Sequence, residues 1–252
     1  MVRSVARVSG VVTPAVWPLF DLQVETPRVE LRYATDDDLQ ALAAFRDGRV
    51  VEVGEEPFDG DSSFYMRGPQ ARWKAITGEW GARSRTSAAW WHLAFAVRAD
   101  GELVGQQNIT AGEFPQVRTV SSFSFLAKPY RGQGLGKEMR AAIIHLAFHG
   151  LGALRAESDA FVDNLPSAGI STALGYEPNG TLVATRPSGP ALMRRFLLTR
   201  ERWGVRRRDD IQIDGLAASL PLLGLTETAE PEPGADAAVV EVSGVGEEES
   251  ET

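Results

Sequence analysis

Cysteine is absent from the 252-residue chain, which excludes disulfides, thiolate metal clusters and a cysteine nucleophile. No apolar run approaches the length of a membrane span. Residues 1–17 are interrupted by Ser, Gly, Thr and Pro, which argues against a secretory signal. We therefore expect a cytoplasmic protein with no membrane partner and no metal site.

Lys and Arg are absent from residues 225–252, a segment that holds nine acidic residues and no aromatic one. The nine are Glu227, Glu230, Glu232, Asp236, Glu241, Glu247, Glu248, Glu249 and Glu251. Such a composition predicts a disordered, solvating tail rather than an interaction tail or pseudo-substrate. Without these nine charges the net charge of −8 becomes +1, and a nearly neutral body argues against nucleic-acid binding.

The length and the hydrophobic content of 43% allow one domain with extensions at both ends. We place an N-terminal extension at residues 1–24 and the domain at residues 25–204. A basic linker with a C-terminal helix follows over residues 205–224, and the acidic tail occupies residues 225–252.

A glycine-rich stretch, FLAKPYRGQGLG over Phe125–Gly136, is the most informative part of the chain. An apolar run leads into it, and a helical apolar pattern follows it from Leu135 to Ala147. The order is therefore strand, glycine loop and helix N-terminus, where free backbone N–H groups and the helix dipole favour an anion such as phosphate.

The spacing of the glycines separates the phosphate-binding motifs. A Walker A loop requires Ser or Thr after Gly-Lys, whereas Glu138 follows Gly136-Lys137 here. A dinucleotide fingerprint requires G-x-G-x-x-G, whereas Gly132, Gly134 and Gly136 form G-x-G-x-G. Taken alone, the loop could also be an ordinary helix start.

A second segment carries further motif residues. Residues 154–160 alternate as in a strand, and DNLPSAGISTALGYEPNG then places Asn164, Ser167 and Gly175-Tyr176 in order. Together the two segments resemble the GNAT superfamily of N-acyltransferases. Arg131, Gly134 and Gly136 match its R/Q-x-x-G-x-G/A loop, and the N-x-x-S…LGY pattern matches the RimJ/RimL-type branch.

The resemblance implies an α+β fold, with helices on both sides of a central, mixed, mostly antiparallel sheet that splays between two parallel strands. It also implies acetyl-CoA (coenzyme A) as the cofactor, with the pantetheine arm in the gap, here between residues 122–127 and 153–160. The implied cofactor-binding residues are Phe125, Leu126, Ala127, Arg131, Gly132, Gln133, Gly134, Leu135, Gly136, Lys137 and Asn164.

The rest of the chain fits this element order. We expect a strand at Val29–Tyr33, a helix capped by Thr35, a helix at Pro69–Thr77, and strands at 92–98, 102–110 and 117–127. Final strands are expected near 176–185 and 192–199, and a helix at 211–223 that packs on the domain or on a second subunit of a homodimer. Arg206–Arg208 are interpreted as a solvated linker and Trp90-Trp91 as core and rim packing.

Acyl transfer from a thioester requires an oxyanion contact, a proton for the departing thiolate and a neutral amine. A backbone N–H near Phe125–Ala127 would supply the first. Many GNAT enzymes carry a tyrosine where Ser171 stands here, so the resemblance favours Ser167 as the proton donor, with Ser171 as the alternative. Asn164 would bind the pantetheine arm or cap its helix.

The spacing fixes no general base. Glu113, Asp59, His92 and Glu157 are candidates, with Glu113 preferred, and a water chain is the alternative. His145 and His149 are interpreted as structural. The resemblance implies a protein N-terminal amine as acceptor, and the low pKa of an α-amine suits a weak base. The alternatives are a small amine or lysine acceptor, a longer acyl-CoA, or a CoA-binding regulatory protein without turnover.

Overall fold

The computed structural model describes residues 16–60, 62–206 and 208–226, so the predicted acidic tail lies almost wholly outside the described residues. The helices are α1 (Asp36–Ala43), α2 (Pro69–Ser84), α3 (Phe114–Val117), α4 (Leu135–His145), α5 (Leu165–Ala173) and α6 (Arg200–Gly204). The strands are β1 (Gln23–Glu25), β2 (Glu30–Tyr33), β3 (Trp90–Ala99), β4 (Glu102–Gly112), β5 (Thr119–Leu126), β6 (Arg155–Phe161), β7 (Glu177–Arg186), β8 (Gly189–Thr199) and β9 (Gln212–Asp214).

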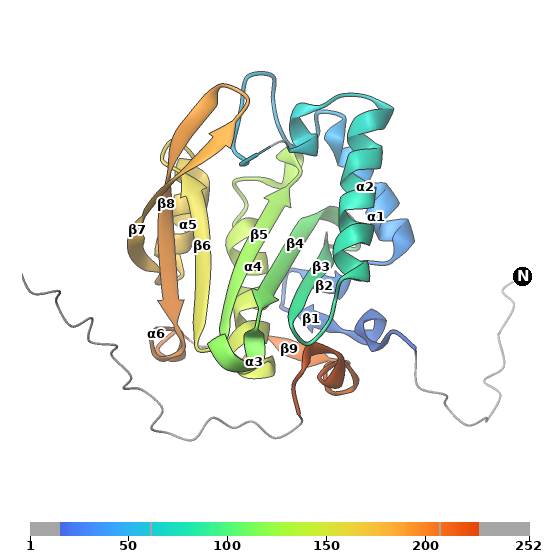
Figure 1. The fold of residues 1–252 in the computed structure, drawn as a ribbon, viewed down its shortest axis with the longest axis vertical. Coiled ribbons are helices and arrows are strands. Elements are labelled where there is room, and N and C mark those ends of the chain that lie inside the picture. The colour runs from blue at the N-terminus through green and yellow to red at the C-terminus, as the bar shows by residue number, and fades with distance from the viewer. Residues whose placement is uncertain (1–15, 61, 207, 227–252) are drawn as a thin grey trace, which may run out of the picture.

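The strands form one sheet in the order β7-β8-β6-β5-β4-β3-β2-β1-β9. All the neighbouring pairs given a register are antiparallel except β5 and β6. A parallel pair needs a long crossover, and α4 supplies it behind the sheet (Figure 1). The expected α+β fold, with its mixed and mostly antiparallel sheet, is confirmed.

The parallel pair is short, and this creates the gap. Strands β5 and β6 pair only from Thr119 with Arg155 to Ser121 with Glu157. Beyond these positions β5 stays paired with β4, and β6 stays paired with β8. The two strands therefore diverge, as Figure 1 shows between the green and yellow arrows.

Two hydrophobic clusters cover the two faces of the sheet. The larger one joins the sheet to α4 and includes Trp91, Phe95, Ile109, Met139 and Ile143. The smaller one joins the other face to the region of α1 and includes Leu39, Leu42, Phe45, Phe64 and Phe125. Phe125 thus packs on the face of the sheet that α1 covers.

Local sequence signals explain several boundaries. The Thr35 side chain accepts a hydrogen bond from the Asp38 backbone N–H, and the Asp38 carboxylate accepts one from the Thr35 backbone N–H, so the predicted capping box is present. Glycine is required at Gly105, because a Cβ there would lie 2.2 Å from the carbonyl oxygen of Phe125. Strands β4 and β5 can therefore approach closely beside the gap.

Two predicted elements differ from the structure. Helix α2 runs to Ser84 rather than Thr77. The prediction ended too early because Gly78, Gly81 and Ala82 are small residues that do not continue the apolar pattern of a helix. Residues 211–223 form strand β9 and two 3-10 turns rather than a helix, because β9 pairs with the edge of β1. The strand predicted at 117–127 begins at Thr119, after the helical turn α3.

The segments next to the predicted domain are also more structured than expected. The N-terminal extension, as far as it is described, contains a 3-10 turn at Pro18–Asp21 and most of β1. Arg206 and Arg208, which we interpreted as a solvated linker, both contact the domain, although Arg206 is exposed. Arg206 donates to the Ala173 carbonyl, and Arg208 forms an ion pair with Glu138 of α4 at 2.7 Å.

Candidate active site

The glycine loop presents unpaired amides at the N-terminus of α4. Gly132 and Gly134 have φ of 75° and 81°, a region that favours glycine, and Gly134 is the residue that precedes the helix. Within the described residues, the backbone amides of residues 132–136 have no hydrogen-bond acceptor. This is the arrangement that binds an anion at a helix N-terminus.

The side chains around the loop mostly hold its shape. Arg131 turns back to the carbonyl oxygens of Leu126, at 3.2 Å, and Val50. Arg28, from the turn before β2, donates to the Gln133 carbonyl at 2.8 Å. Leu135 is buried in the core, whereas Lys137 is exposed. Arg131 and Lys137 are the two exposed cations among the predicted cofactor-binding residues.

The strand beside the gap offers alternate amides. The Ala127 amide donates to the Val104 carbonyl on β4 and is therefore occupied. Because hydrogen bonding alternates along an antiparallel pair, the amide of Phe125 also faces β4, and that of Leu126 faces the gap. Of the three residues predicted to provide the oxyanion contact, Leu126 has the required direction.

A buried guanidinium bridges the two diverging strands from the α4 side of the sheet. Arg140 of α4 donates to Ser158 Oγ on β6 at 2.9 Å and to Ser124 Oγ on β5 at 3.2 Å. The residue is 4% exposed, and no ion-pair partner for it lies among the described residues. Burial lowers the pKa of Arg140, and burial raises the pKa of the neighbouring Tyr176 to about 12.

The two candidate proton donors lie at different depths on α5. Ser171 is fully buried and contacts Ser158 Oγ and the Ser167 carbonyl oxygen, both at 3.4 Å. Ser167 lies one turn earlier and is partly exposed. The Asn164 side chain accepts from the Ser167 amide at 3.3 Å, so its predicted capping role is present.

The structure does not bring Glu113 to the gap. This exposed residue follows β4 at the end where Gly112 pairs with Trp90, whereas the gap opens beyond Ser121, which pairs with Thr110. Sequence reasoning could not place Glu113, because only the register shows which end of β4 it occupies. On β6, Glu157 and Asp159 share Arg195 as an ion-pair partner. Burial raises the pKa of Asp159.

The irregular segment 50–60 crosses the open end of the gap. Glu52 pairs with Lys128 beside the loop, and the Pro57 carbonyl accepts from Asn164 at 3.4 Å. Further on, the Gly60 amide donates to Thr185 of β7 at 2.6 Å. Figure 1 shows this pale-blue segment spanning from the α2 side to the β7–β8 hairpin.

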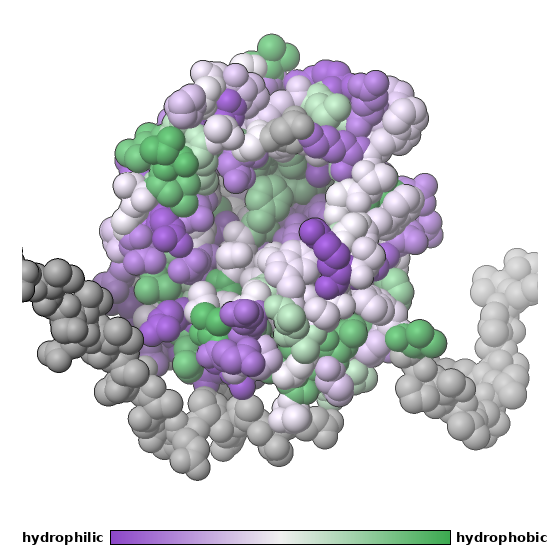
Figure 2. All heavy atoms as spheres, viewed as in Figure 1, coloured by the Kyte–Doolittle hydropathy of each residue, from purple (hydrophilic) through white to green (hydrophobic). Residues whose placement is uncertain are grey.

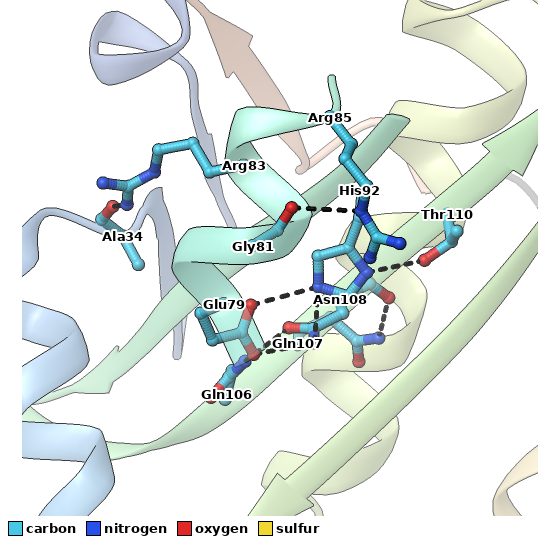
Figure 3. A network of polar contacts seen from close by, with 10 residues as sticks. All are labelled: Ala34, Glu79, Gly81, Arg83, Arg85, His92, Gln106, Gln107, Asn108 and Thr110. Atoms are coloured by element: carbon cyan, nitrogen blue, oxygen red, sulfur yellow. Dashed lines mark hydrogen bonds and ion pairs between the residues drawn. The ribbon is translucent and has the colours of Figure 1, made fainter. Parts of the chain in front are cut away.

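A polar network lies between α2 and the sheet, and His92 is the one member of it that the sequence analysis named as a candidate. His92 Nε2 lies 3.1 Å from Glu79 Oε2, and His92 Nδ1 lies 2.9 Å from Thr110 Oγ1 (Figure 3). Gln106 and Asn108 of β4 complete the surroundings of Glu79. Burial raises the pKa of Glu79, but the hydrogen bonds from His92, Gln106 and Asn108 outweigh it and leave that pKa below its ordinary value.

A cavity of about 280 Å³ opens beside this network. Its lining includes Arg46, Ser63, Lys74, Glu79 and His92. Arg46 itself lies over the rings of Phe64 and Phe125, with its guanidinium carbon 3.8 Å and 5.1 Å from their centres. The same face of the molecule is hollowed between α2 and β7–β8, with hydrophobic side chains on the floor over β5 (Figure 2).

The residues that form the loop, the diverging parallel strands and the crossover helix lie within a match to a known family model. Residues 28–177 match the model described as an acetyltransferase (GNAT) domain. The chain belongs to the GNAT acetyltransferase family. Members of this family are N-acetyltransferases that use acetyl-CoA, so the predicted family and enzyme class are confirmed.

Solved structures resemble this GNAT protein at low sequence identity. Mycobacterium smegmatis RimJ in complex with a CoA disulfide is 19% identical, with a TM-score of 0.59 over 81% of this chain and 95% of that chain. RimL, a ribosomal L7/L12 alpha-N-protein acetyltransferase in complex with coenzyme A, is 17% identical, with a TM-score of 0.57 over 69% and 95%. A ribosomal-protein-S5-alanine acetyltransferase from Vibrio fischeri is 15% identical, with a TM-score of 0.57 over 72% and 98%.

Among the described residues of this GNAT protein, no helix is long and apolar enough to cross a bilayer, and no group of His, Asp and Glu could hold a metal ion. The candidate site combines backbone amides, serines and a buried guanidinium, with the Glu79–His92 network on the neighbouring strands.

Proposed function

We propose that the protein transfers an acetyl group from acetyl-CoA directly to a primary amine, and that the acceptor is a protein or peptide N-terminal α-amine. One observation carries the proposal. The unpaired amides of residues 132–136 lie at the end of β5, next to the gap that β5 and β6 leave open. A diphosphate held by the amides would place the rest of an extended coenzyme in the gap.

The residues of the chain fit this group. Glycine at 132 and 134 leaves the amides open, since a Cβ would stand beside the anion. The inward-facing amide of Leu126 can stabilise negative charge on an acyl oxygen in the gap. Bound acetyl-CoA supplies the activated acyl carbon, and the chain orients it and manages the protons.

For the proton that the departing sulfur requires, we propose Ser167. It is partly exposed in the first turn of α5, whereas Ser171 is fully buried. A thiolate with a pKa of about 8.5 is a moderate base, so a positioned hydroxyl with a water relay suffices.

The acceptor class rests on chemistry and on likeness. About one tenth of an α-amine is neutral at pH 7, whereas fewer than about one lysine in a thousand is. That difference favours the α-amine as nucleophile. The names of the similar RimL and S5-alanine structures point to the same class of acceptor. We place the reaction in the cytoplasm, where acetyl-CoA and new protein N-termini meet.

The loop is tested with Gly134→Val, because a side chain at this position would strain a φ of 81°, and its Cβ would lie 3.2 Å from the Arg28 guanidinium that holds the loop. We expect acetyl-CoA to bind at least about 100-fold more weakly, measured by calorimetry. Gly180→Val is the matched control, since Gly180 has a φ of 85° and open space around it on β7. Normal coenzyme binding by Gly134→Val, with the fold retained, would contradict the loop assignment.

The acceptor is tested by thiol release with a panel of peptides, lysine derivatives and small amines. Preference for peptides with a free N-terminus supports the proposal. Transfer to small amines alone, or binding without thiol release, would replace it with a metabolite enzyme or a regulatory CoA-binding protein. A longer acyl-CoA series defines the donor in the same assay.

A further inference from the structure

A buried positive charge lies at the narrow end of the gap, on the α4 side of the sheet. Strands β5 and β6 are last paired at Ser121 with Glu157. Just beyond that row, the Arg140 guanidinium donates to Ser158 Oγ at 2.9 Å and to Ser124 Oγ at 3.2 Å. It therefore spans the gap, with one hydroxyl partner on each diverging strand.

This guanidinium has only neutral partners. Arg140 is 4% exposed, and no carboxylate in the described part of the chain forms an ion pair with it. Burial raises the pKa of the neighbouring Tyr176 to about 12, so the phenol carries no charge at neutral pH. Arginine stays protonated even when it is buried. A buried charge with neutral partners is unfavourable, so a negative charge that arises beside it would be strongly stabilised.

The other charged groups near the gap face away from this guanidinium. Glu157 and Asp159 flank its partner on β6, and side chains alternate along a strand, so both carboxylates lie on the opposite face, where they pair with Arg195. On α4, Glu138 pairs with Arg208. Strand β5 and helix α5 contain no charged residue.

The reactive end of an extended coenzyme would reach the same place. The glycine loop follows β5, so an arm held at the loop runs back along β5 toward the narrow end and passes Leu126 before Ser124. The Cα atoms of these two residues are about 7 Å apart. Both amides face the gap, because hydrogen bonding alternates along β5. The sulfur of the arm would lie in this stretch, next to the hydroxyl that the guanidinium polarises.

We propose that Arg140 is the counter-ion of the thiolate that forms when the acetyl group leaves. This inference rests on the proposed function. The amine nitrogen bonds to the acyl carbon, the carbon–sulfur bond breaks, and its electron pair stays on the sulfur. The amine proton passes to water. The Ser124 and Ser158 hydroxyls accept from Arg140, and each keeps a hydrogen to donate to the sulfur. Ser167 supplies the proton for the thiolate in a later step.

The test is a titration of the coenzyme thiol in the complex of the protein with CoA, followed by the ultraviolet absorbance of the thiolate. The chain contains no cysteine, so the coenzyme carries the only thiol, and the complex with desulfo-CoA gives the baseline. We expect the bound thiol to titrate about one pH unit below the ordinary thiol pKa of about 8.5. Arg140→Met should remove this shift. Arg140→Lys should retain most of it, because lysine keeps the charge.

Turnover gives a second measurement. The negative charge on sulfur appears only as the carbon–sulfur bond breaks, so Arg140 stabilises the transition state more than bound acetyl-CoA. We expect Arg140→Met to lower kcat about 10²-fold while KM for acetyl-CoA changes little.

Arg200→Met is the matched control. Arg200 is a partly buried arginine that donates to the carbonyls of Ala153 at 2.9 Å and Phe148 at 3.0 Å, and it follows β8 where Thr199 pairs with the start of β6, away from the gap. The bound thiol should titrate in this variant as it does in the wild type. Melting temperature shows whether each variant is folded.

If Arg140→Met does not fold, Ser124→Ala and Ser158→Ala replace it. Each should reduce the shift by about half, because each removes one of the two donors. A bound thiol that titrates at its ordinary pKa in the wild type, or that shifts equally in Arg140→Met, overturns the counter-ion role while acetyl transfer itself stands. If CoA does not bind to the wild type, the proposed function fails as well.

Discussion

Single residues determine which groups at this site can donate a proton to a departing thiolate or stabilise its charge. The tyrosine that many GNAT enzymes place on this helix is replaced by Ser171, which is buried against Ser158. Arg140 also bonds to Ser158 and spans both diverging strands. A buried cation beneath the gap lowers the energy of negative charge within it, so a strong acid is less necessary.

The two serines can be separated by mutation. We expect Ser167→Ala to lower kcat about tenfold with little change in KM for acetyl-CoA, because it removes the more exposed hydroxyl. Ser171→Ala should instead lower the free energy of unfolding by about 1 kcal/mol, because its buried hydrogen bonds are lost. Steady-state kinetics and urea unfolding measure the two effects. The reverse order of kcat losses would assign the donor role to Ser171.

The sequence predicted some site residues and could not predict others. The loop could be predicted because its three glycines lie within five residues of the chain and its chemistry depends on backbone amides. The polar network around His92 could not be predicted, since Glu79 and Thr110 stand 13 and 18 residues from His92 and meet it only in the folded structure. Arg140 was hidden for a different reason, because a charged residue in a helix is normally expected to face solvent.

Strand β9 lies in a segment for which the sequence predicted a helix, and this difference changes how the C-terminal segment packs. A three-residue strand has too short a pattern to distinguish it from a helix turn, and its partner β1 is equally short. The segment that carries β9 begins with Arg208, which forms an ion pair with Glu138 in the first turn of α4. The C-terminal segment thereby connects the edge of the sheet to the helix that presents the loop.

The docking of β9 depends on Gly215. A Cβ at this position would lie 1.9 Å from the Asp21 carbonyl oxygen, and φ is 71°. We expect Gly215→Ala to lower the free energy of unfolding by about 2 kcal/mol more than Gly180→Ala, where φ is similar but the space is open. Urea unfolding measures the difference, and hydrogen exchange should increase at β1. Equal losses in the two variants would show that β9 contributes little to the fold.

For the molecule as a whole, the sheet separates two tasks. The face with α4 presents the loop and the buried guanidinium, and the face with α2 presents the Glu79–His92 network and the hollow. The gap between β5 and β6 connects the two faces, because the two strands are not hydrogen-bonded to each other there. We therefore expect a coenzyme held by the loop and an acceptor in the hollow to meet at this gap.

The same molecule carries carboxylates whose titration links its stability to pH. Burial raises the pKa of Asp38, but hydrogen bonds from Arg98 and Thr35 outweigh it and hold the pKa low. The Arg208 hydrogen bond holds the pKa of Glu138 low. The hydrogen bonds from His92, Gln106 and Asn108 outweigh burial and hold the pKa of Glu79 low as well. Because these groups bind protons less readily when folded, their contributions are complete above the unfolded pKa values of about 4. These contributions to stability are lost as the pH falls through the pKa values of the folded protein.

We therefore expect the free energy of unfolding to be nearly constant from about pH 6 to 8 and to fall steadily below about pH 5. Asp159 acts in the opposite direction, since burial raises its pKa and the folded state takes up that proton first. Asp38→Asn should make the decline shallower, because it removes the group that pairs with Arg98 at 2.5 Å. Asp37→Asn, an exposed change on the same helix, should leave it unchanged. Urea unfolding across the pH range measures both slopes, and equal slopes would mean that the Arg98 pair does not cause the acid sensitivity.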